Sequence, residues 1–145
     1  MAYAINYQEF IDEQGVRLSK YYSRNKERLS DFGSKERFIT WYLNELTVCG
    51  CKCHYCNTSI LDIRKLINGG VIMGRAVRGE GLRGPSFEID RKNPLGKYEE
   101  SNCVLSCYYC NNDKSNTFSY ETYLNVIGPL KGQGWRVLLD QLKVQ

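Results

Sequence analysis

Two Cys-x-x-Cys motifs restrict the fold of this chain more than any other part of its sequence. They are Cys53-His54-Tyr55-Cys56 and Cys107-Tyr108-Tyr109-Cys110, with fifty residues between them. Each motif can form a knuckle that presents two thiolates, and four thiolates complete the tetrahedral site that structural zinc prefers. The spacing therefore predicts one structural Zn²⁺ held by Cys53, Cys56, Cys107 and Cys110.

The cysteine count favours metal binding in a reducing compartment over a disulfide framework. The seven cysteines are an odd number, and the N-terminus MAYAINYQEFIDEQG lacks the basic and apolar regions of a secretory signal. No apolar run approaches the roughly 20 residues that span a bilayer. We therefore expect a cytoplasmic protein without a membrane segment. Cys49 or Cys51 could replace Cys53 only by breaking the knuckle, and Cys103 is expected to be a small core residue.

Net charge alone does not identify a partner for this chain. The 20 basic and 16 acidic residues give a formal charge of +4, which zinc bound to four thiolates would lower to +2. Nucleic-acid binding must therefore be argued from how the charge is distributed. The length of 145 residues fits one domain over 1–145. Within this domain, a helical N-terminal extension (1–47) would precede a zinc-held core (48–118) and C-terminal helices (119–145).

Hydrophobic periodicity and turn residues predict a mixture of helices and short strands, which is an α+β fold. One or two helices are expected in 1–33, one over 35–46 with Ser34 as its N-cap, and one over 59–67 with Asn57 or Thr58 as its N-cap. Further helices are expected over 108–115, 120–127 and 134–144. The helix over 120–127 should end at Gly128-Pro129. The helix over 35–46 should bury a face of Phe38, Trp41, Tyr42 and Leu46. Trp135, Leu138, Leu139 and Leu142 should be core residues of the last helix. Two short strands are expected, SFEID at 86–90 and CVLS at 103–106. The first alternates, with Phe87 and Ile89 on one face and Glu88 and Asp90 on the other.

Basic residues gather in two segments. The N-terminal helices carry a face of Arg17, Lys20, Arg24, Lys26 and Arg28, which interleaved acids dilute, so a solvated face is favoured. Residues 69–84 hold six glycines together with Arg75, Arg78 and Arg83. This segment is interpreted either as a hairpin whose arginines bind phosphates or as a flexible surface loop.

The segment from Cys53 to about residue 118 resembles the HNH, or ββα-metal, nuclease family. The resemblance rests on the order of its parts: a zinc knuckle, a strand ending in Asp90, a loop with Asn102, a second strand, and a second knuckle followed by Asn111 and Lys114. It implies a small zinc-stabilised ββα-metal core with flanking helices. It also implies a phosphodiester hydrolase that uses a catalytic divalent ion.

The chain departs from the usual family pattern at one important position. The histidine that normally follows the aspartate and activates water is Arg91 here. One branch of the family carries Asp-Arg, and it resembles this chain over a longer stretch that includes FITWY, the Cys-His-Tyr-Cys knuckle and CNNDKSNTFS. The first 30 residues do not share the resemblance.

The chemistry of phosphodiester hydrolysis assigns roles to the matched residues. Mg²⁺ or Mn²⁺ prefers oxygen ligands, and Asp90 and Asn111 supply a carboxylate and an amide oxygen. Arg91 stays protonated at neutral pH, so it cannot be a general base and is expected to clamp the scissile phosphate. Asn102 is expected to orient the loop. Lys114 is expected either to contact phosphate or to be a solvated helix lysine.

Two residues of the first knuckle are candidates for activating the nucleophile. His54 is the only histidine, with a reference pKa of about 6.5 that suits a general base. Tyr55 carries a phenol that could orient water, or attack directly if it were deprotonated. The resemblance favours Tyr55 over His54.

These observations predict a metal-dependent HNH endonuclease that hydrolyses double-stranded DNA in a sequence-specific, restriction-like manner. The active-site strand would then place Arg75, Arg78 and Arg83 at the DNA. A palindrome-cutting enzyme with one site per chain would act as a homodimer. The alternatives are a zinc-stabilised DNA-binding module without cleavage activity, and a nuclease or toxin that acts on RNA.

Overall fold

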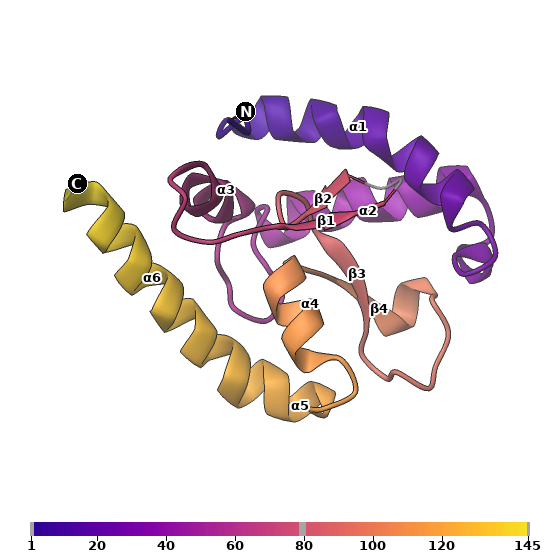
Figure 1. The fold of residues 1–145 in the computed structure, drawn as a ribbon. Coiled ribbons are helices and arrows are strands. Elements are labelled where there is room, and N and C mark those ends of the chain that lie inside the picture. The colour runs from indigo at the N-terminus through magenta and orange to yellow at the C-terminus, as the bar shows by residue number, and fades with distance from the viewer. Residues whose placement is uncertain (1, 79–80, 145) are drawn as a thin grey trace.

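The computed structural model describes residues 2–78 and 81–144 and shows helices around two small antiparallel sheets (Figure 1). The α+β prediction is therefore confirmed. The helices are α1 (Tyr7–Arg24), α2 (Lys35–Cys49), α3 (Ile60–Asn68), α4 (Tyr108–Lys114), α5 (Tyr120–Thr122) and α6 (Gly128–Val144). The strands are β1 (Arg75–Val77), β2 (Gly81–Arg83), β3 (Glu88–Arg91) and β4 (Cys103–Ser106). None of the described helices is long and apolar enough to cross a membrane.

A ββα unit lies at the centre of the fold. Strands β3 and β4 pair antiparallel from Glu88↔Ser106 to Arg91↔Cys103, and α4 follows β4 directly. Side chains alternate along β3. Phe87 and Ile89 are buried, and the Phe87 ring meets Phe10 of α1 edge-on. Glu88 and Asp90 point the other way, towards α4. The alternation predicted for this strand is confirmed.

Helices α1 and α2 pack together and cover the apolar face of the ββα unit (Figure 1). Helix α2 begins as expected, because the Ser34 side chain accepts a hydrogen bond from the backbone N–H of Arg37. Its predicted buried face is also confirmed by the low exposure of Phe38, Trp41, Tyr42 and Leu46.

The N-cap of helix α3 is Ser59, whereas Asn57 or Thr58 was expected in that role. The reason lies in the first knuckle. The backbone N–H of Asn57 donates to the carbonyl of Cys53, and the carbonyl of Thr58 accepts from the N–H of Cys53. These two residues close the knuckle, so the helix can begin only after them.

The predicted helix end at Gly128-Pro129 is wrong. A π-helical turn over Tyr123–Ile127 leads from α5 directly into α6. Pro129 lies just after this π-helical turn, where the α-helical pattern of hydrogen bonds is already interrupted. Gly128 and Gly132 let α6 lie against the first knuckle, since a Cβ on either would collide with a knuckle carbonyl. Trp135 is buried as expected, whereas Leu138, Leu139 and Leu142 are only half-buried.

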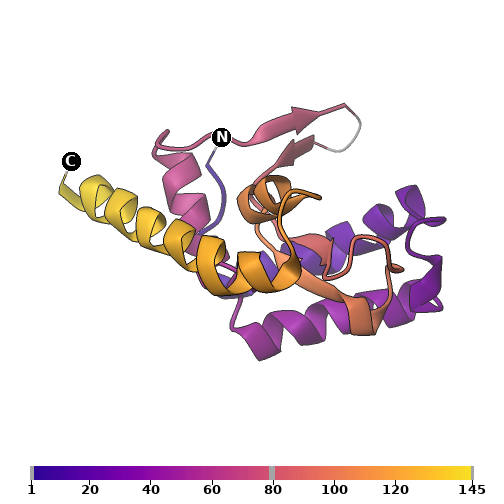
Figure 2. The same ribbon diagram turned by 90° about the horizontal axis from the view of Figure 1, so that it is seen from below.

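The Gly-rich arginine segment contains a hairpin, one of its two predicted forms. Strands β1 and β2 pair from Arg75↔Arg83 to Val77↔Gly81, and Gly79 and Glu80 lie outside the described residues. The hairpin stands out from the rest of the chain beyond α4 (Figure 2). Arg75 and Arg78 are exposed on it.

Candidate zinc centre and active site

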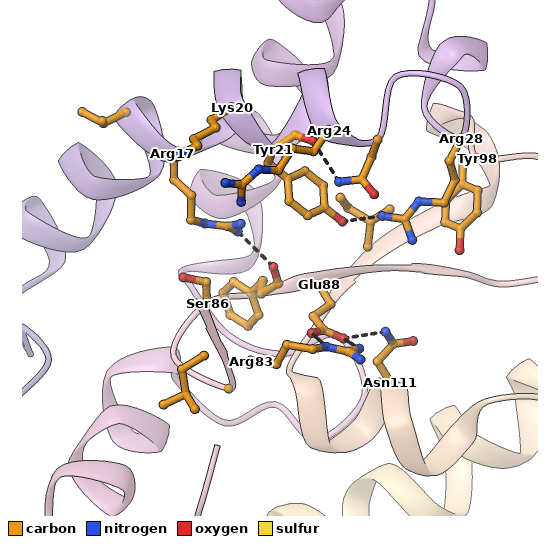
Figure 3. A pocket seen from close by; sticks show the side chains of 16 residues that line it. Arg17, Lys20, Tyr21, Arg24, Arg28, Arg83, Ser86, Glu88, Tyr98 and Asn111 are labelled. Carbon is orange, nitrogen blue, oxygen red and sulfur yellow. Dashed lines mark hydrogen bonds and ion pairs between the residues drawn. The ribbon is translucent and has the colours of Figure 1, made fainter. Parts of the chain in front are cut away.

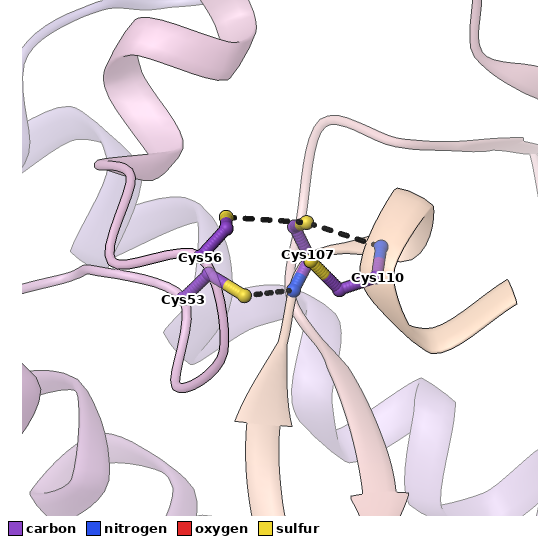
Figure 4. Close-up of side chains that lie close together, drawn as sticks. All are labelled: Cys53, Cys56, Cys107 and Cys110. Atoms are coloured by element: carbon purple, nitrogen blue, oxygen red, sulfur yellow. Dashed lines mark hydrogen bonds between the residues drawn. The ribbon is translucent and has the colours of Figure 1, made fainter. Parts of the chain in front are cut away.

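The four predicted zinc ligands meet at one buried point (Figure 4). Their Sγ atoms all lie within 4.8 Å of one another, and those of Cys56 and Cys107 are 4.0 Å apart. Sulfurs about 2.3 Å from a tetrahedral zinc would be about 3.8 Å from each other, so the donor set fits this ion. Four buried cysteines close together could therefore hold structural zinc.

The second knuckle is also built into the start of α4. Cys107 is the N-cap of this helix, and its Sγ accepts from the N–H of Cys110 at 3.4 Å. The N–H of Cys107 in turn donates to the Sγ of Cys53 at 3.3 Å. Burial raises the pKa of the Cys107 thiol well above its usual range, a cost that a bound cation would offset.

The remaining cysteines lie outside this cluster. Cys103 is buried in β4, and burial raises the pKa of its thiol to about 12, which makes it an inert core residue as predicted. Burial also raises the pKa of Cys49 and of Cys51. Neither replaces Cys53 in the four-sulfur group.

Asp90 is buried between the first knuckle and α4. The hydroxyl of Tyr55 donates to its Oδ2 in a short hydrogen bond, and Lys114 Nζ lies 3.2 Å from the same oxygen. Lys114 also donates to the carbonyl of Arg91 at 3.2 Å, and its side chain is 1% exposed. The alternative of a solvated helix lysine is therefore wrong: Lys114 neutralises the candidate metal ligand from inside the fold.

Asn111 lies one helical turn before Lys114 and contacts a carboxylate that the sequence reasoning missed. Its Nδ2 donates to Glu88 Oε1 at 2.9 Å, and Arg83 Nε donates to Glu88 Oε2 at 2.6 Å. Because the amide nitrogen of Asn111 faces Glu88, its Oδ1 is the atom left to accept or ligate. The signal that could have identified Glu88 was its position two residues before Asp90, on the same face of a strand.

Two carboxylates of β3 and one amide of α4 lie along this face. Helix α4 runs along β3, so Asn111 meets Glu88 while Lys114 meets Asp90. Two carboxylates and an amide oxygen are the donor types that Mg²⁺ and Mn²⁺ prefer. In this structure the negative charge of Glu88 and Asp90 is balanced by Arg83 and Lys114.

Arg91 lies at the end of β3, where the loop begins. Its Nη1 donates to the carbonyl of Gly96 at 3.0 Å, and its guanidinium lies 4.5 Å from the centre of the Tyr98 ring. Asn102 holds the same loop through three hydrogen bonds with the backbone of Asn93 and Lys97. These contacts are what an orienting residue would make.

The two candidate activators have different partners. His54 is exposed, and its Nε2 lies 2.7 Å from the hydroxyl of Tyr120. Partial desolvation of the ring and then the charge of Lys92 lower the pKa of His54, and the charges of Cys53 and Asp90 oppose this shift. Burial and the hydrogen bond to Asp90 raise the pKa of Tyr55. Of the two, it is Tyr55 that contacts the Asp90 carboxylate.

A cavity of about 360 Å³ separates α1 from the strand that carries these acids (Figure 3). Four basic residues come from the α1 side, namely Arg17, Lys20, Arg24 and Arg28, and Arg83, Glu88 and Asn111 come from the opposite side. Lys20, Arg24 and Arg28 are exposed, as a solvated face requires, and together with Arg17 they also line this cavity. Only Lys26, the fifth member of that predicted face, is absent from the lining. Arg75 and Arg78 are likewise not among the lining residues of the described chain.

Comparisons with known proteins agree with this geometry. No family model and no curated protein matches the chain. A solved structure of PacI, described as a rare-cutting HNH restriction endonuclease, matches it with a TM-score of 0.59 and 25% identity. The match covers 88% of this chain and 80% of that one. The chain has an HNH-like fold that resembles PacI.

Proposed function

We propose that this chain is a divalent-metal-dependent endonuclease that hydrolyses phosphodiester bonds in double-stranded DNA, with restriction-like sequence specificity. The observation that carries the proposal is the ββα unit itself, in which α4 presents Asn111 and Lys114 to the acids of β3. The likeness to a DNA restriction endonuclease over most of both chains supports a DNA nuclease. The four cysteines would hold structural zinc and leave no ligand position for catalysis.

In this proposal the residues on β3 and α4 prepare a site for one cation and one phosphate. Mg²⁺ or Mn²⁺, when bound, would stabilise charge on the phosphate and on the leaving oxygen. Asp90 and Asn111 would hold the ion, and Glu88 fixes the Asn111 amide so that its oxygen is available. Lys114 balances Asp90 when no cation is present, and its burial leaves the predicted contact with phosphate to Arg91. With one such site per chain, two copies would act together on a palindrome.

Arg91→Lys should lower the cleavage rate by about 100-fold. The Arg91 guanidinium is oriented by the Gly96 carbonyl and the Tyr98 ring, so its remaining N–H groups can grip a phosphate as a fork. A lysine ammonium keeps the charge but cannot reproduce two parallel hydrogen bonds. The single-turnover rate on a supercoiled plasmid measures the effect, and a lysine variant that cuts at the wild-type rate would exclude the fork.

Tyr55→Phe should slow cleavage by about 10- to 100-fold without weakening DNA binding. The change removes only the hydroxyl that contacts Asp90 and leaves the ring packed against Tyr123. His54→Ala is the matched comparison, because His54 contacts Tyr120 instead. A normal rate for Tyr55→Phe beside an inactive His54→Ala would transfer the role to His54.

One observation favours a second candidate, a zinc-stabilised DNA-binding module without cleavage activity. Asp90 is already satisfied by Tyr55 and Lys114, so the carboxylate is stable without a metal. Duplex DNA, single-stranded DNA and duplex RNA of one sequence, each incubated with Mg²⁺ or Mn²⁺, separate the possibilities. The proposal expects discrete fragments from duplex DNA. Binding without cleavage would indicate the module, and fragments from RNA alone would indicate a ribonuclease.

A further inference from the structure

We infer that the cavity between α1 and β3 is a second phosphate-binding site, which holds the DNA backbone beside the scissile phosphate. The inference rests on the proposed function, because it takes the substrate to be duplex DNA. It adds a binding surface on α1, outside the segment that carries the HNH pattern. Figure 3 shows the α1 side chains facing the site residues across this cavity.

The cavity concentrates the positive charge of the whole chain. Five cations and one carboxylate line it, and that carboxylate, Glu88, is paired with Arg83. The other fifteen basic and fifteen acidic residues of the sequence balance one another. A concave surface with excess charge of one sign focuses the field and attracts a counter-charged ligand.

The cations on the α1 side remain available to an anion. Among the described residues, Arg17 donates only to neutral groups, which are the side chains of Gln14 and Tyr42 and the carbonyl of Phe87. Within the described part of the chain, no carboxylate forms an ion pair with Lys20, Arg24 or Arg28. Lys20 and Arg24 are exposed, so a ligand can reach them.

The spacing of these residues matches a polyanion better than a small anion. Arg17, Lys20 and Arg24 follow one another at intervals of three and four residues, which places them on one face of α1. From Arg17 to Arg24 the helix rises by about 10 Å. One strand of DNA carries about three phosphates over that length.

Aromatic rings connect this surface to the candidate active site. The guanidiniums of Arg28 and Arg91 lie 5.0 and 4.5 Å from the centre of the same Tyr98 ring. Arg28 also donates to the hydroxyl of Tyr21 at 2.7 Å. A strand whose scissile phosphate lies at Arg91 would therefore meet Arg28 and the α1 face with its neighbouring phosphates.

The test compares two double variants that lose the same charge. Lys20→Gln/Arg24→Gln removes two cations of the cavity. Lys65→Gln/Lys143→Gln removes two lysines of α3 and α6 that form exposed ion pairs with Asp62 and Asp140. Binding of a 30-base-pair duplex by the zinc-loaded protein, measured without added Mg²⁺ or Mn²⁺ at several NaCl concentrations, gives the slope of log K against the logarithm of the NaCl concentration. All four side chains lie on the surface, so both variants should melt like the wild type.

The Lys20→Gln/Arg24→Gln variant should bind every DNA sequence more weakly, and the magnitude of its slope of log K against the logarithm of the NaCl concentration should fall by about 1.8. The slope of the Lys65→Gln/Lys143→Gln control should fall much less. Equal slopes for the two variants would overturn the inference. Such a result in a protein that still cuts DNA would leave the nuclease proposal standing. A wild-type protein that neither binds nor cuts DNA would overturn both.

Discussion

Cys107→Ser should leave the chain without zinc and largely unfolded at 37 °C. Cys107 is fully buried, caps α4, and joins the second knuckle to Cys53. Structural zinc contributes roughly 10–16 kcal/mol in small zinc-dependent folds, which equals or exceeds the total stability of about 5–15 kcal/mol expected of a domain. Elemental analysis of zinc per chain and a thermal melt by circular dichroism measure the two effects together.

Cys49→Ser is the matched control for this prediction. Cys49 is half-buried at the end of α2 and lies outside the four-sulfur cluster. It should keep one zinc per chain and melt close to the wild type. A Cys107→Ser protein that melts like the wild type, or a wild-type protein purified without zinc, would remove the zinc centre from the account.

Asp90→Asn should lower the rate of DNA cleavage by at least about 1,000-fold. The amide keeps the shape of the side chain but lacks the charge that would hold a divalent cation beside the phosphate. DNA binding should be retained, because the substitution removes a negative charge that would repel the phosphates of the DNA backbone. Single-turnover cleavage and Kd, measured on one plasmid-derived duplex, separate the two effects.

Folding must be checked in this variant, because Asp90 is also the partner of a buried lysine. Removing one member of a buried pair costs about 3–5 kcal/mol, and the side chain of Lys114 is 1% exposed. Asp90→Asn/Lys114→Met removes both charges and should regain most of the lost melting temperature while remaining inactive. Asp62→Asn, on the exposed face of α3, should cut normally. A well-folded double variant that cuts at the wild-type rate would contradict the role of Asp90.

Local patterns predicted much of the fold and part of the site. The two knuckles depend on spacing within four residues, so the four zinc ligands could be identified before their sulfurs were seen together. Strand β3 is short and alternates clearly, which is why its buried and polar faces were assigned correctly. Ser34 was recognised as a cap because the signal lies within one helical turn.

Contacts between distant segments were not predictable in the same way. The pairing of Lys114 with Asp90 depends on how α4 docks on β3, and no local pattern distinguishes a buried lysine from a solvated one. The cavity forms because α1 lies across β3, some 70 residues away along the chain. Gly128 lies inside a helix that packs against a knuckle carbonyl, and only a residue without a side chain allows that tertiary contact.

The central claim is that a divalent ion at Asp90 makes this HNH-like fold a DNA nuclease. Its most direct test is the conversion of supercoiled plasmid by the zinc-loaded wild type and by Asp90→Asn, each in Mg²⁺, in Mn²⁺ and without an added divalent ion. The account predicts nicked or linear DNA only for the wild type and only with a divalent ion present. Cleavage that persists without an added divalent ion, or a folded, DNA-binding wild type that leaves the plasmid intact in both metals, would contradict it.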